Sequence, residues 1–159
     1  MPTHYTDKIQ NIALNTFEIT CYMFPMEEWE MEDADDIEKP DGSLRSIVEF
    51  DGAAKGGMVI SPSHTLAQAI AANMLGTEEA SQDEKEGALN EIANIICGNT
   101  VPLFAKNDHI CVIRPPRIAS NTDHPDHLFK GMQKEELQVL LDEGIADITI
   151  YYTNGGEHD

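Results

Sequence analysis

The sequence predicts an α+β domain in which long helices pack on one face of an antiparallel β-sheet. Segments typical of strands are joined by glycine-rich turns instead of by crossover helices, which favours antiparallel pairing. Segments with apolar residues three and four positions apart, as in helices, stand before and between the strands. We take residues 1–159 as a single domain, because a chain of this length can bury a real core.

The N-terminal part combines a helical pattern with an acidic insert. A helix is predicted within residues 5–24, and Pro25 ends it. Its apolar positions are Ile9, Ile12, Ala13, Phe17 and Cys21. Residues 26–41 contain nine aspartates and glutamates, with Trp29 and Met31 alternating among them. This insert is either an exposed edge strand or an acidic loop.

A hairpin and a second helix follow. Residues 46–50 and 57–61 are rich in strand-forming residues, and the glycines between them predict an antiparallel hairpin. Ser63 is a suitable N-cap for a helix over residues 64–75, which Gly76 stops.

The C-terminal half begins with a third helix. The segment GALNEIANIICGNT, residues 87–100, predicts this helix, and Gly98 is expected to terminate it. Residues 109–120 then form a strand interrupted by two prolines, and residues 121–131 form a loop. A short helix over residues 134–144 and a closing strand over residues 145–153 complete the predicted order.

The third helix carries a narrow polar line. At about 100° per residue, four of its residues fall along one line: Gly87, Glu91, Asn94 and Gly98. We therefore expect Glu91 and Asn94 to be exposed, and Ile92, Ile95 and Ile96 to be buried against the sheet. Gly87 on this line indicates that another molecule approaches the helix closely. An ordinary solvated face with a stray glycine would give the same pattern.

Composition excludes several classes of partner. The net charge of −19 argues against nucleic acid and against an anionic membrane surface.

There is no apolar run long enough to span a membrane, and residues 1–20 lack the pattern of a signal peptide. The cysteines, Cys21, Cys97 and Cys111, are odd in number and lie in apolar sequence, as reduced core thiols do. We expect a cytoplasmic protein.

The segment DHPDH, with Asp123, His124, Asp126 and His127, is the one candidate for a metal site. Carboxylate and imidazole ligands at close spacing suit divalent transition metals, which would support a metal-dependent hydrolase. Loops of this composition are common in proteins that bind no metal, and we therefore predict no metal ligand among the site residues.

The helix and its surroundings resemble the CheC/CheX/FliY family of chemotaxis phosphatases, and the CheX branch in particular. The resemblance depends on the motif E-x-x-N, here Glu91 to Asn94, and on a family proline matched by Pro115 or Pro116. The upstream hairpin IVEFDGAAKGGMVIS and the helix LAQAIAANMLG are also similar to the family. Gly87 is a departure, because the family commonly has Asp or Ser at that position.

The resemblance implies a phosphatase that acts on the aspartyl-phosphate of a CheY-type response regulator. The regulator would supply Mg²⁺ and a lysine, so no cofactor of the chain's own is expected. Asn94 would position the attacking water and Glu91 would dock onto the regulator, while Gly87 and Gly98 leave room for it. A homodimer is also implied. The alternative within the same fold is a module that binds a regulator, or part of a flagellar or sensory complex, without hydrolysis.

Overall fold

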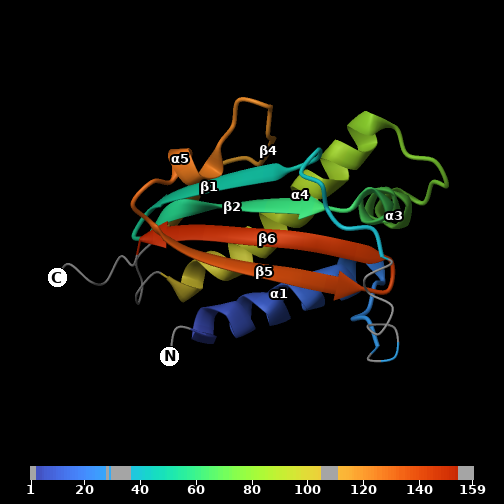
Figure 1. Cartoon of the computed structure of the whole chain (residues 1–159), viewed down its shortest axis with the longest axis horizontal. Coiled ribbons are helices and arrows are strands. Elements are labelled where there is room, and N and C mark those ends of the chain that lie inside the picture. The colour runs from blue at the N-terminus through green and yellow to red at the C-terminus, as the bar shows by residue number, and fades with distance from the viewer. Residues whose placement is uncertain (1–2, 28, 30–36, 105–110, 154–159) are drawn as a thin grey trace.

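The computed structural model describes residues 3–27, 29, 37–104 and 111–153 (Figure 1). The helices are α1 (Thr3–Cys21), α3 (His64–Leu75), α4 (Gln82–Thr100) and the single turn α5 (Pro125–Leu128), with a 3₁₀ helix, η2 (Val101–Leu103). The strands are β1 (Ser46–Gly52), β2 (Lys55–Pro62), β3 (Cys111–Ile113), β4 (Arg117–Ile118), β5 (Gln133–Leu141) and β6 (Gly144–Thr153). No helix among these residues is long and apolar enough to cross a membrane.

The strands form one antiparallel sheet in the order β3-β1-β2-β6-β5, with β4 also paired to β1. Helices α1, α3 and α4 pack on one face, and α1 and α4 run along the back of the sheet in Figure 1. The predicted α+β class, with long helices on one face of an antiparallel sheet, is confirmed.

Alternation along β1 separates the two faces of the sheet. Val48 and Phe50 point into the large core beneath the helices, whereas Ile47 points to the opposite face. On that opposite face Ile47 packs with Phe129, which the segment around α5 supplies, and with Tyr151. The long helices α1, α3 and α4 therefore cover only one side, and α4 is held against β1 and β2 through that large core.

The hairpin and the second helix follow the prediction closely. The Ser63 side chain accepts a hydrogen bond from the backbone N–H of Leu66 at 3.2 Å, and Gly76 closes α3 at φ 70°. The first helix ends earlier than predicted. Tyr22 already has φ 56°, so α1 stops at Cys21 before Pro25 is reached.

The acidic insert begins as an edge contact. Pro25 forms an isolated bridge with Leu141, and the backbone N–H of Met26 donates to the Leu140 carbonyl at 2.9 Å. Residues 38–41 are irregular, and residues 28 and 30–36 lie outside the described part. The choice between an edge strand and a loop is therefore answered only for the two ends of the insert.

The predicted helix over residues 134–144 is wrong, because this segment forms β5 and the turn into β6. Leu137, Val139 and Leu141 alternate toward the core, and the strand pairs with β6 along its length. Pairing with β6 outweighs the local helix preference of Glu, Leu and Gln. The predicted loop over residues 121–131 contains the single helical turn α5.

Candidate functional site

Helix α4 carries the predicted motif, and its start is strongly defined. The Ser81 side chain accepts from the Glu84 backbone N–H at 3.1 Å, and the Glu84 carboxylate accepts from the Ser81 backbone N–H at 2.9 Å. This reciprocal capping box begins the helix at Gln82, five residues before Gly87. The helix continues to Thr100, so the prediction that Gly98 terminates it is wrong. Gly98 keeps helical geometry, and the chain tightens into η2 only at Val101.

The exposed line of α4 lies where the sequence predicts it. Glu91 and Asn94 are exposed, and Ile92 and Ile96 are fully buried beneath the helix. Ile95 is only half-buried, which corrects the prediction for this residue. It lies about 40° around the helix from Glu91, at the border between the two faces.

Neither motif side chain is engaged elsewhere in the described part of the chain. Glu91 forms no ion pair there, and the Asn94 amide forms no side-chain hydrogen bond there. A carboxylate and an amide one turn apart are thus presented to solvent with their hydrogen-bonding capacity unused. Their backbone is fixed, because the helix beneath them is anchored in the core.

The two glycines on this line have no packing role in the described structure. A Cβ at Gly87 would have no atom within 4 Å, and a Cβ at Gly98 would only touch Ile113 Cδ1 at 3.9 Å. An interior glycine costs a helix about 1 kcal/mol relative to alanine. The chain itself therefore gives no steric reason for either glycine, and a surface free of side chains is left beside Glu91 and Asn94.

A partly buried hydrogen bond joins α4 to the sheet. Ser46 on β1 is fully buried, and its hydroxyl donates to Asn90 Oδ1 at 2.6 Å. Asn90 directly precedes Glu91, so this bond ties α4 to β1 beside the motif, while the fully buried isoleucines of α4 determine which side of the helix faces outward. The prediction from sequence missed this contact. The sequence contained a sign of it: Ser46 lies two positions before Val48, so it is a polar residue on the side of its strand that faces the core.

We expect Ser46→Ala to lower the free energy of unfolding by about 1–3 kcal/mol, because the Asn90 amide is left without its partner. The measurement is urea denaturation followed by circular dichroism. Asn99→Ala is the control, because Asn99 is exposed on the same helix and donates only to the Ile95 carbonyl at 3.1 Å. Equal urea midpoints for Ser46→Ala and the unmodified protein would contradict the expectation.

The motif prolines lie beside the C-terminal half of α4. Ile113 is the neighbour of Gly98, and Ile118 on β4 pairs with Ser46, the partner of Asn90. The stretch between Ile113 and Ile118 therefore runs along the helix, with Pro115 exposed and Pro116 half-buried in it. The prolines interrupt β3 and β4 and keep this stretch from forming one continuous strand.

The DHPDH segment does not form a ligand cluster. Asp123 is held by Ser120 and Arg117, and these hydrogen bonds lower the pKa of its carboxyl group. Asp126 is bound instead by Tyr151 at 2.7 Å and Lys134 at 3.0 Å, which lower the pKa of that carboxyl group. Within the described ranges no group of three His, Cys, Asp or Glu side chains could hold a metal ion. The metal-hydrolase alternative therefore has no structural support.

Comparison with known sequences decides the family. The model of the family described as chemotaxis phosphatase CheX matches residues 44–137, more than half of the chain. The chain belongs to the CheX family. The matched range runs from just before β1 into β5 and includes the whole of α4. No curated protein is similar to the chain at a significant level.

Solved structures share the CheX fold over nearly the whole chain. Chemotaxis protein CheX from Vibrio vulnificus has a TM-score of 0.69 at 17% identity, covering 94% of this chain and 97% of that one. A CheC-like superfamily protein from Shewanella sp. PV-4 has a TM-score of 0.67 at 19% identity, covering 96% and 99%. A CheX–CheY–BeF₃–Mg²⁺ complex from Borrelia burgdorferi gives 0.65 at 19% identity, covering 93% and 97%. At these identities the likeness concerns the fold.

Proposed function

We propose that the protein is a phosphatase for the aspartyl-phosphate of a CheY-type response regulator. The observation that carries this proposal is the pair Glu91 and Asn94, exposed and unengaged in the described structure on a helix anchored in the core. Membership of the CheX family supports the reaction. The Borrelia complex supports the partner, because a protein of similar fold is there in complex with CheY.

The chemistry of an amide suits the reaction. The Asn94 amide can accept a hydrogen bond from a water and donate one without becoming charged. A water held in line with phosphorus attacks it, the bond between phosphorus and the aspartyl oxygen breaks, and phosphate and a free carboxylate result. Positioning the attacking water is the main contribution that a catalyst makes to phosphoryl transfer, and one amide on a fixed helix can make that contribution.

Glu91 is better suited to docking than to proton abstraction. A free carboxylate near a phosphoryl group would repel it, whereas an ion pair with the regulator's lysine would fix the register of α4 in the partner's active site. The regulator supplies the phosphorylated aspartate, the lysine and Mg²⁺, and this chain supplies no cofactor of its own. Gly87 and Gly98 leave the surface open for the regulator's loops.

The proposal is tested by a dephosphorylation screen. The protein is incubated with each purified, phosphorylated response regulator of its host, and phosphate release is followed with time. One regulator should lose phosphate much faster than it does alone. A regulator that binds but is not dephosphorylated would favour the alternative, a CheX-like module that docks without hydrolysis.

We also expect a homodimer. β5 lies at an edge of the sheet, and in the described part of the chain its outer side is covered only near Leu140 and Leu141. An open edge of this kind is a template for pairing with a second copy. Light scattering at micromolar concentration should give twice the monomer mass, and a clean monomer would remove the expectation.

A further inference from the structure

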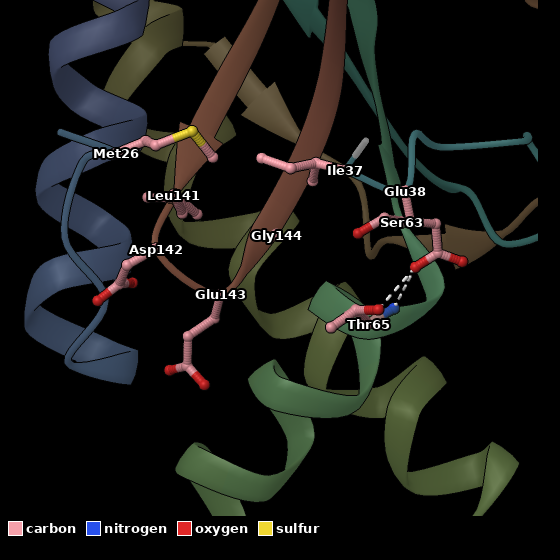
Figure 2. Close-up of a pocket in the computed structure, with 9 residues that line it drawn as sticks. All are labelled: Met26, Ile37, Glu38, Ser63, Thr65, Leu141, Asp142, Glu143 and Gly144. Carbon is pink, nitrogen blue, oxygen red and sulfur yellow. Dashed lines mark hydrogen bonds between the residues drawn. The ribbon is translucent and has the colours of Figure 1, made fainter. Parts of the chain in front are cut away.

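A second candidate site lies at the end of the molecule where α1, α3 and the β5–β6 turn meet. A cavity of about 330 Å³ opens there between the turn, the start of α3 and the connection that follows α1 (Figure 2). None of the described residues that line it belongs to α4, so it is separate from Glu91 and Asn94. Its size is at the lower end of the range of ligand pockets.

The floor of this cavity is apolar. Met26 and Leu141 are almost completely buried, and Ile37 is half-buried beside them. Figure 2 shows the ends of the Met26 and Ile37 side chains directed toward one another across the cavity. An apolar side chain that entered here would bury the exposed part of Ile37, worth about 25 cal/mol for each Å² removed from water, because Met26 and Leu141 are already almost completely out of water.

One side of the cavity is bounded by a fixed carboxylate. Glu38 Oε1 accepts hydrogen bonds from the Thr65 backbone N–H at 2.9 Å and from the Thr65 hydroxyl at 2.7 Å. These bonds lower the pKa of the Glu38 carboxyl group, which is therefore charged at neutral pH. Both donors belong to an uncharged residue, and a nearby group that can carry positive charge, the His64 side chain, is bonded to Asp41 and also lowers the pKa of the Glu38 carboxyl group.

The opposite side carries two more carboxylates, on the β5–β6 turn (Figure 2). Asp142 Oδ1 accepts from the Phe24 backbone N–H at 3.2 Å, and Glu143 Oε2 accepts from the Asn73 side-chain amide at 2.9 Å. These donors are also uncharged. Among the described lining residues there is no lysine, arginine or histidine, so acidic residues border the cavity on two sides, with the carboxylates of Asp142 and Glu143 directed outward at its rim in Figure 2.

One wall of the cavity is closely packed backbone. Gly144 has φ +150°, and a Cβ there would lie 2.7 Å from Leu66 Cβ and 2.9 Å from Ser63 Oγ. The turn therefore packs directly on the start of α3, and the Ser63 backbone N–H donates to the Ile145 carbonyl at 2.8 Å. This wall needs little rearrangement on binding, which favours affinity.

We propose that this cavity docks a basic segment of a partner protein, in which one apolar side chain is flanked by arginine or lysine. The apolar floor accepts the central side chain, and the carboxylates on the two sides pair with the flanking cations. The site is independent of the phosphatase proposal.

The test uses the full chain and the capped peptide acetyl-GSRLRSG-amide. Titration is followed by ¹H–¹⁵N NMR, and the signals of Thr65, Glu143 and Gly144 should shift first. A peptide with serine in place of leucine should bind about three- to tenfold more weakly, because the apolar contact is lost. A peptide with glutamates in place of the arginines should not bind. Equal affinity for the leucine and serine peptides would overturn the proposal.

Matched variants separate docking from general attraction to a chain of net charge −19. Glu143→Gln should weaken binding of the arginine peptide at least about threefold, whereas Glu136→Gln, the same charge change on an exposed side chain of β5, should leave it within error. Equal weakening in both variants would show nonspecific attraction and would overturn the proposal. Pentylamine binding as tightly as the peptide would overturn it in favour of a site for small organic cations.

Discussion

Asn94→Ala is expected to slow dephosphorylation of the cognate regulator by roughly a hundred- to a thousandfold, comparable with the loss of one transition-state hydrogen-bond donor. The alanine removes the amide that would hold the attacking water, and it leaves α4 intact because Asn94 is exposed and has no side-chain partner in the described structure. Binding to the regulator should change little, since the amide contributes a small contact area. The measurement is single-turnover phosphate release at saturating protein.

Asn99→Ala is the matched control for this variant. Asn99 is exposed one and a half turns further along the same helix and lies off the Glu91–Asn94 line. It should retain the full rate. If the Asn94→Ala variant dephosphorylated the regulator at the full rate, the assignment of water positioning to Asn94 would be wrong, even though the chain belongs to the family.

Glu91→Ala is expected to weaken binding of the regulator by about tenfold or more, because the proposed ion pair with the regulator's lysine is lost. Binding is measured with a regulator carrying beryllofluoride and Mg²⁺ as a stable mimic of the phosphorylated state. The difference between the variant and the unmodified protein should shrink as salt is raised, since screening removes the pair's contribution from the unmodified protein and the variant has no pair to lose. Glu91→Gln keeps the shape and removes the charge, so it should show most of the same loss.

Glu18→Gln, an equal charge change on the exposed face of α1, is the control and should bind normally. The reverse division of labour would contradict the mechanism. If Asn94→Ala abolished binding while Glu91→Ala bound normally but could not hydrolyse, the carboxylate would be the catalytic group.

The sequence predicts those parts of the fold in which local signals agree with tertiary packing. The hairpin β1–β2 and the capped helix α3 each have a matching turn or cap beside the matching residue pattern, and the closing strand β6 has a matching alternation. The exposure of Glu91 and Asn94 follows from helical geometry alone, because the apolar residues of α4 fall on the other side. The E-x-x-N motif in this setting also indicated the family.

Tertiary structure decided what depends on residues far apart in the chain. β5 is a strand because β6 pairs with it along its length, and local propensity gives no information about that pairing. Gly98 stays inside α4 because the core holds the helix as far as Thr100. The bond between Ser46 and Asn90, whose partners are 44 positions apart, adds a contact between α4 and the sheet that no local pattern contains. The sequence by itself thus determined the motif and the face of α4 that is exposed, whereas the orientation of that face relative to the sheet depends on long-range packing.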